Sequence, residues 1–158
     1  MSGENNKNTI ADKNEISGFI KENKLATVCC TISDNPYCFN CFYSFLEEEN
    51  CIVFKSTPGA KHCDILDKNN KVAGTIVSGK TDLSKLQGIQ FEGIIFKESS
   101  IYKLKAAASY YFKFPFALAM PGELWVIELQ SIKFTNHAKG FGHKSYWQKK
   151  AVKKDLSY

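Results

Sequence analysis

The segment KSTPGAKH, residues 55–62, concentrates side chains that can bind an anion directly after the apolar run 51–54. It supplies the hydroxyls of Ser56 and Thr57, two lysines and a histidine. Hydroxyls, the free backbone N–H groups at a helix start and an ammonium group can together bind a phosphate. The segment therefore predicts either a phosphate site built from Ser56, Thr57 and Lys61, or an ordinary helix N-cap flanked by solvated lysines.

A second candidate surface is the strand predicted at Tyr37–Leu46. Side chains alternate between the two faces of a strand, so Asn40, Phe42 and Ser44 share one face, while an aromatic-rich set that includes Cys41 shares the other. The aromatic-rich face is typical of a core. An amide, an aromatic ring and a hydroxyl suit the wall of a site that binds a ring carrying polar groups.

The cysteines offer a third kind of chemistry. Residues 38–41 form a CxxC motif that could hold zinc together with His62 and Cys63. On a strand, however, residues three apart face opposite sides, so both sulfurs cannot reach one metal. The N-terminus lacks the apolar segment of a signal peptide, and most of the thiols lie in apolar runs. We therefore expect no zinc, a cytoplasmic location and six reduced thiols, which are Cys29, Cys30, Cys38, Cys41, Cys51 and Cys63.

The composition favours one globular domain without a nucleic-acid or membrane partner. The chain has 158 residues, 44% of them hydrophobic, which is enough to fill a core. Its net charge is +5, but all 21 basic side chains are lysines, and arginine is the preferred residue for reading phosphates and bases. Six lysines between positions 139 and 154 are typical of a solubilising tail. No apolar run approaches the roughly 18 residues that span a bilayer.

The elements that must position these groups are mostly short strands joined by hairpins. Helices are predicted around residues 16–20, where Ile16, Phe19 and Ile20 recur at helical spacing, after Pro58, and at 101–112. Gly88 and Gly93 predict bends or bulges. The pattern indicates a mainly β, closed antiparallel barrel of six or seven strands with flanking helices. The predicted strands are Leu25–Ile32, Tyr37–Leu46, Cys51–Ser56, Lys71–Val77, Leu86–Phe96 and Leu124–Phe134, the last as one strand or two.

Seven motifs occur in a fixed order along the chain: NCFY, VAGTIV, GIQFEG, FPFALA, LWVIEL, IKFTN and GFGHK. Together they resemble the pyridoxamine-phosphate oxidase-like, FMN-binding split-barrel family, and especially its bacterial YhbP-like branch. The resemblance covers residues 14–148 and implies one split-barrel domain there. Residues 1–13 are then expected to be a flexible leader, and residues 149–158 a basic tail.

The resemblance also implies a homodimer with one FMN in each of two clefts at the subunit interface. The phosphate motif of the family falls on Ser56, Thr57 and Lys61. The position that often carries an arginine near the phosphate corresponds, within one residue, to Asn40, which is a departure from the family. The resemblance also implies that the backbone at Phe54 and Lys55 lines the flavin ring, beside the wall that the alternation predicts at Phe42, and that Gln90 contacts it from the partner chain. His143 and Trp147 either cover the flavin from the partner chain or form a packed tail.

The function that follows is FMN binding, with flavin-dependent oxidoreduction of an unspecified substrate and a nicotinamide or small molecule as its reaction partner. Pyridoxamine-phosphate oxidation itself is not expected, because the oxidases that resemble this family use an arginine beside a C-terminal histidine, and no arginine stands beside His143. No catalytic acid or base is evident. The alternative is therefore a non-catalytic dimeric module that binds flavin or another ligand.

Overall fold

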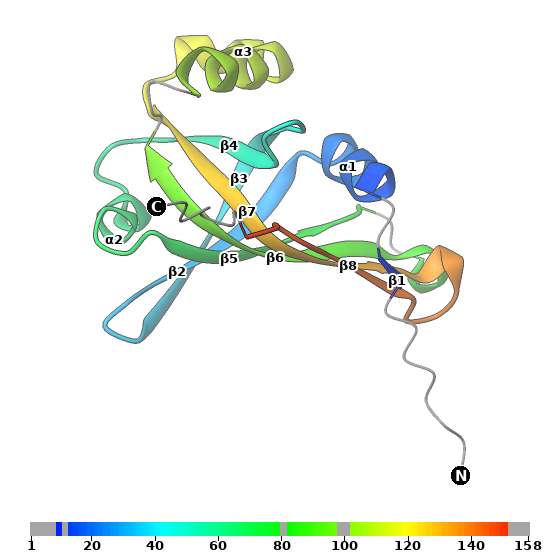
Figure 1. The fold of residues 1–158 in the computed structure, drawn as a ribbon. Coiled ribbons are helices and arrows are strands. Elements are labelled where there is room, and N and C mark those ends of the chain that lie inside the picture. The colour runs from blue at the N-terminus through cyan, green and yellow to red at the C-terminus, as the bar shows by residue number, and fades with distance from the viewer. Residues whose placement is uncertain (1–8, 11–12, 80–81, 98–101, 152–158) are drawn as a thin grey trace, which may run out of the picture.

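The computed structural model describes residues 9–10, 13–79, 82–97 and 102–151, and these form one curved sheet with helices around it (Figure 1). The helices are α1 (Lys13–Glu22), α2 (Lys61–Leu66) and α3 (Lys103–Lys113), with short 3-10 turns η1 (Leu83–Lys85), η2 (Pro115–Ala119) and η3 (His137–Lys139). The strands are β1 (Thr9–Ile10), β2 (Leu25–Ile32), β3 (Asn35–Leu46), β4 (Cys51–Ser56), β5 (Lys71–Val77), β6 (Gln87–Lys97), β7 (Glu123–Asn136) and β8 (Lys144–Gln148).

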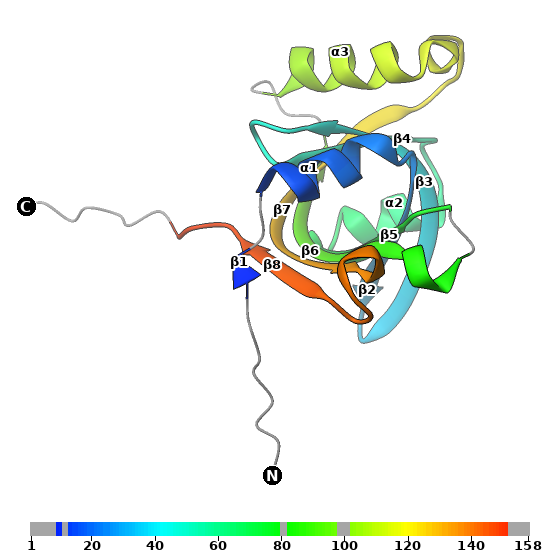
Figure 2. The same ribbon diagram turned by 90° about the vertical axis from the view of Figure 1, so that its right-hand side faces the viewer.

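The sheet closes on itself. Its strand order is β1-β8-β7-β4-β3-β2-β5-β6, and β6 pairs in turn with β7, so strands β2 to β7 form a ring (Figure 2). The long strand β7 makes this possible, because its first half pairs with β4 and its second half pairs with β8. Strands β2 to β8 are antiparallel, and β1 adds a short parallel pairing to β8. The predicted mainly β split barrel is confirmed.

The interior of the barrel is the main core. Alternate residues of each strand point inward, as in β2, where Ala26, Val28 and Cys30 are buried. Helix α1 covers one opening of the ring with the apolar face predicted from the sequence, and the ring of Phe19 lies 5.1 Å from that of Phe134. The hydroxyl of Tyr43 donates a hydrogen bond to a carbonyl of α1, which fixes the helix to the barrel.

A second, smaller core lies outside the barrel. Helix α3 packs there on β3, β4 and β7 through Ala106, Tyr110 and Phe114. Strand β4 is consequently buried on both faces, which explains its unbroken apolar sequence Cys51-Ile52-Val53-Phe54. This arrangement places α3 and η2 beside the end of β4, where the candidate anion-binding segment begins.

Several boundaries differ from those expected. Strand β8 lies within the glycine-punctuated basic stretch and was not predicted as a strand. In the expected leader, Thr9–Ile10 forms β1 and Lys13 begins α1, while residues 1–8 and 11–12 lie outside the described residues. In the expected tail, residues 152–158 lie outside them as well. The bulge expected at Gly93 is present, with a register shift after Glu92, whereas Gly88 pairs regularly.

The expectation of six reduced thiols is wrong for one pair. Cys29 and Cys38 are direct cross-strand partners in the β2–β3 hairpin, with Cα atoms 4.2 Å apart, and they form a disulfide. The spacing of cysteines along a single strand does not show this pair, because the bond joins two neighbouring strands. Cys30, Cys41, Cys51 and Cys63 are free and buried.

The two cysteines of the CxxC motif lie on opposite faces of β3. Cys38 lies on the exposed face of β3 and is bonded to Cys29, while Cys41 is buried on the other face. Within the described ranges, no three histidine, cysteine or acidic side chains are grouped as metal ligands would be. Those ranges also contain no helix with the length and apolar character needed to cross a membrane.

Candidate functional site

The corner after β4 is a tight turn. The N–H of Ala60 donates to the carbonyl of Thr57 at 3.2 Å, and Gly59 has a φ of +86°, so Pro58 and Gly59 occupy the central positions of a type II turn. Helix α2 begins only at Lys61, with Ala60 at its N-cap and no side-chain cap. The N-cap predicted at Ser56 or Thr57 is therefore wrong, because the Pro-Gly turn delays the helix.

The turn brings together two side chains that are six residues apart. The Oγ atom of Ser56 lies 2.5 Å from Nε2 of His62, and the imidazole stacks on Phe39 with ring centroids 3.9 Å apart. The thiol of Cys63 donates to the same serine oxygen at 3.5 Å. Burial lowers the pKa of His62 below its ordinary value. His62 was not among the predicted site residues, although the Pro-Gly dipeptide was a signal that the chain reverses between it and Ser56.

The two lysines of the segment have different surroundings. The ammonium group of Lys55 donates to the carbonyls of Ala117 and Met120, at 2.8 and 2.7 Å, and so fastens η2 and the residues after it to β4. The ammonium group of Lys61 lies over the ring of Tyr37, 4.7 Å from its centroid. Lys55 is thus a structural anchor, while Lys61 has no hydrogen-bond or ion-pair partner within the described part of the chain.

A pocket of about 240 Å³ lies between the ends of β3 and β4 and the η2 segment. Its walls bring together five of the ten predicted cofactor-binding residues: Asn40, Phe42, Lys55, Ser56 and Thr57. The remaining walls, which were not predicted, are Cys41, Tyr110, Phe116, Ala117, Met120 and Pro121. The exposed apolar residues of the FPFALAMP stretch were the available signal for these walls. We call this cavity the corner pocket.

The wall predicted from the alternation in β3 is found in part, because Asn40 and Phe42 line the corner pocket, whereas Ser44 is buried and does not. The Oδ1 atom of Asn40 accepts a hydrogen bond from Thr27 at 2.8 Å, so its amide N–H groups remain for a ligand. The side chain of Phe42 is 53% exposed. Phe54, in contrast, is fully buried with its ring in the barrel core, so only its backbone is available to a ligand.

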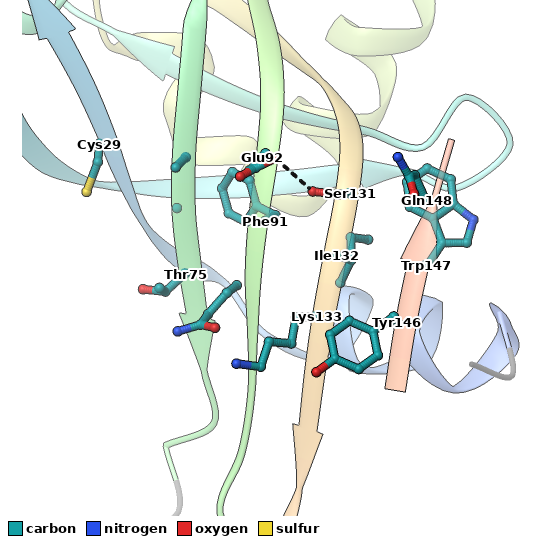
Figure 3. Close-up of a pocket in the computed structure, with 13 residues that line it drawn as sticks. Cys29, Thr75, Phe91, Glu92, Ser131, Ile132, Lys133, Tyr146, Trp147 and Gln148 are labelled. Carbon is teal, nitrogen blue, oxygen red and sulfur yellow. Dashed lines mark hydrogen bonds between the residues drawn. The ribbon is translucent and has the colours of Figure 1, made fainter. Parts of the chain in front are cut away.

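A larger groove of about 600 Å³ lies on the outer face of β5, β6, β7 and β8 (Figure 3). It contains two further predicted residues, Gln90 and Trp147. Thr75, Gln90, Lys133 and Tyr146 are successive cross-strand partners, and they form one polar row across the groove. In the neighbouring row, Ser131 donates to Glu92 at 3.2 Å. We call this surface the outer groove.

The last two predicted residues lie in neither cavity. Lys61 stands on α2 beside Tyr37, as described above. His143 lies in the turn before β8, where its carbonyl accepts from the N–H of Asn136. Within one chain, therefore, the ten predicted residues do not form a single site.

The sequence relatives decide the family. The UPF0306 protein plu4501 of Photorhabdus laumondii is 31% identical over 134 residues, which cover 85% of this chain and 94% of that protein. The UPF0306 protein YE0465 of Yersinia enterocolitica is 30% identical over the same length, with 85% and 91% covered. The chain belongs to the UPF0306 family. No protein-family model matches it.

Solved structures place this UPF0306 protein among split barrels. A heme-binding protein of Mycobacterium smegmatis superposes with a TM-score of 0.72 and 16% identity, over 89% of this chain and 59% of that protein. An FAD-binding protein of Mesorhizobium loti gives 0.65 and 14%, over 77% and 92%. HutZ, a heme storage protein of Vibrio cholerae, gives 0.63 and 14%, also over 77% and 92%. At these sequence identities the structural similarity shows the fold alone.

The residues of the corner pocket suit the phosphate group of a flavin mononucleotide and one edge of its ring. Its aromatic and apolar walls suit a ring edge, while the Asn40 amide and the hydroxyls of Ser56 and Thr57 can donate to anionic oxygens. Among the described residues no carboxylate lines the pocket, so no fixed negative charge opposes a phosphate there. Its volume is smaller than the roughly 300–1,000 Å³ of most ligand pockets. A complete site therefore needs another wall.

Proposed function

We propose that this UPF0306 protein binds FMN and acts as a flavin-dependent oxidoreductase of the YhbP-like branch, located in the cytoplasm. The observation that carries the proposal is the corner pocket, which collects Asn40, Phe42, Ser56 and Thr57 from two strands and a turn. Bound FMN would supply the electron-transfer chemistry, with a nicotinamide or another small molecule as its partner. On the wall of the corner pocket the chain would supply phosphate donors at Ser56 and Thr57 and a ring side at Phe42 and the backbone of residues 54–55. The ammonium group of Lys61, which lies outside the pocket over Tyr37, would turn towards the phosphate on binding.

The proposal includes a homodimer, because the corner pocket is small and its rim is apolar. Large hydrophobic side chains are exposed next to it, and a contiguous exposed apolar surface is typical of an interaction site. In a two-fold dimer, the outer groove of the second protomer would supply the missing wall, with Gln90 and Trp147 towards the ring and His143 near its edge. The exposed large apolar residues that line the pocket are Phe42, Phe116 and Met120.

The second candidate is a dimeric flavin-binding or ligand-binding module without turnover, and one observation favours it. No described side chain lining the corner pocket is available as an acid or base near neutral pH. Burial raises the pKa of Cys41 to about 12 and raises that of Tyr110, and the ammonium group of Lys55 is held by two carbonyls. Split-barrel neighbours that bind heme or FAD widen the range of ligands for such a module. Anaerobic addition of NADH or NADPH to the FMN-loaded protein separates the two, because only an oxidoreductase bleaches the flavin.

Calorimetric titration with FMN tests the binding proposal. We expect Lys61→Ala to weaken binding by about 1.5–3 kcal/mol, the usual contribution of a hydrogen bond to a charged group, or roughly 10- to 150-fold. Lys68→Ala, an exposed lysine just after the same helix, is the matched control and should leave the affinity unchanged. Riboflavin lacks the phosphate, so it should bind poorly to all three proteins. Equal FMN affinities for wild type and Lys61→Ala would show that the phosphate lies elsewhere.

A further inference from the structure

The hydroxyl of Ser56 is the group in the corner pocket whose hydrogen-bond partners are most fully defined. It lies 2.5 Å from Nε2 of His62 and receives the thiol hydrogen of Cys63 at 3.5 Å, and it also lines the pocket. The inference below rests on the proposed function, since it concerns the phosphate end of that site.

The hydrogen-bonding capacity of a hydroxyl limits what Ser56 can do. A serine oxygen carries one donor hydrogen and two acceptor lone pairs. The neutral imidazole of His62 has two tautomers. Where Nε2 carries the hydrogen, it already donates to Ser56, and anion binding takes up no proton. Where Nε2 is unprotonated, Ser56 must donate its hydrogen to that nitrogen, and at least one lone pair is left for the pocket, since the Cys63 thiol can donate to this oxygen at 3.5 Å or to the carbonyl of Thr57 at 3.6 Å. In this state Ser56 presents an acceptor to an anion, and the contact is repulsive.

Protonation of His62 reverses the arrangement. The Nε2–H group then donates to Ser56 and occupies a lone pair of the hydroxyl oxygen. The hydroxyl hydrogen is freed to point into the pocket, where it can donate to a phosphate oxygen. We propose that His62 is a positioning residue that couples phosphate binding to the uptake of one proton.

The surroundings of His62 are consistent with this role. Stacking on Phe39 holds the ring in place, and burial keeps its pKa below the ordinary value, so the imidazole is neutral at pH 7 before a ligand binds. The other titratable groups on α2 are Lys61, Cys63 and Asp64. Strands β2 and β3, which pack against this helix, contribute Cys30 and Tyr37, and Lys97 of β6 interacts electrostatically with Cys63.

Calorimetry of FMN binding in buffers of different ionisation enthalpy measures the proton directly. At pH 7, we expect the number of protons taken up per FMN bound to be higher by close to one for wild type than for His62→Gln. The glutamine amide keeps the contact with Ser56 but cannot titrate. Between about pH 5.5 and pH 8, wild type should lose roughly tenfold more FMN affinity than His62→Gln, since the donor to the phosphate is lost. The variant also corrects for the ionisation of the phosphate itself, with a pKa near 6.

Two further measurements complete the test. Ser56→Ala should show the same proton count as His62→Gln, because the coupling passes through the serine hydroxyl, and riboflavin should show no coupling with any variant. Equal proton uptake by wild type, His62→Gln and Ser56→Ala, with FMN bound in all three, would overturn this inference while leaving the proposed function intact. If neither FMN nor riboflavin bound to wild type at any pH, the proposed function would fail and this inference with it.

Discussion

The Cys29–Cys38 disulfide should stabilise the fold by a measurable amount. It closes a loop with a sequence separation of nine residues. Cross-linking a loop of about ten residues removes conformational entropy from the unfolded chain that corresponds to about 2.5 kcal/mol at room temperature. We therefore expect reduction of the oxidised protein, or Cys38→Ser, to lower the free energy of unfolding by about that amount.

The assay is chemical denaturation of the same preparation with and without a reductant. Wild type should shift to a lower denaturation midpoint on reduction, with little change in the slope beyond that caused by opening the cross-link. The double variant Cys29→Ser, Cys38→Ser is the matched control, and its midpoint should be the same in both conditions. Thiol counting in denaturant should give four reactive groups before reduction and six after it, since the other four cysteines are free.

Two results would refute this reasoning. If the oxidised preparation gave six reactive thiols in denaturant before reduction, Cys29 and Cys38 would not be bonded to each other. If the oxidised and reduced proteins unfolded at the same midpoint, the cross-link would exist without the predicted entropic effect. Cys38 lies on the exposed face of β3, so a reductant can reach the bond in the folded protein.

Two other perturbations test the barrel itself. Gly74→Ala should destabilise the protein by about 1–3 kcal/mol, because the new Cβ would lie 2.3 Å from the Phe91 ring and 2.5 Å from the carbonyl of Thr27. Gly18→Ala in α1 meets no atom within 4 Å and should stabilise the protein by up to about 1 kcal/mol. Thermal unfolding of the two variants should therefore show shifts of opposite sign. Burial lowers the pKa of Lys113 to about 8, so between pH 8 and 10 the unfolded chain binds more protons than the folded protein and stability should rise with pH. Urea titrations of Lys113→Met should give a free energy of unfolding that changes less with pH than that of wild type. An equally steep pH dependence in the variant would contradict this.

Much of the fold was predictable because its signals are local. The bounds predicted for β2, β4 and β5 are those found, since each strand is an apolar or alternating run that ends in turn residues. The same alternation placed Asn40 and Phe42 on one face of β3, and both line the corner pocket. The alternation of side chains along a strand thus predicted that these two side chains line the same pocket.

The features that were missed depend on contacts between residues distant in the sequence. The ammonium group of Lys55 is bonded to carbonyls 62 and 65 residues further along the chain, and no local pattern shows that η2 would lie there. Strand β8 has a basic, glycine-flanked sequence, and it becomes a strand because the second half of β7 offers it a free edge. The Ser56–His62 contact required a tight Pro-Gly turn, where a helix start was expected.

The two cavities are related by the register of the sheet. Asn40, Thr27, Thr75 and Gln90 are successive cross-strand partners, so they lie on one row of the outer barrel surface. Three strand spacings separate Asn40 from Gln90, or about 14 Å along the curved sheet. A ligand held at Asn40 and Ser56 is therefore not enclosed by Gln90 of the same chain. A two-fold axis beside this row would bring the outer groove of a second copy onto the corner pocket, and symmetry would repeat the contact, giving two equivalent sites. The proposed flavin ring site thus requires the dimer, whereas the proposed phosphate end belongs to a single chain.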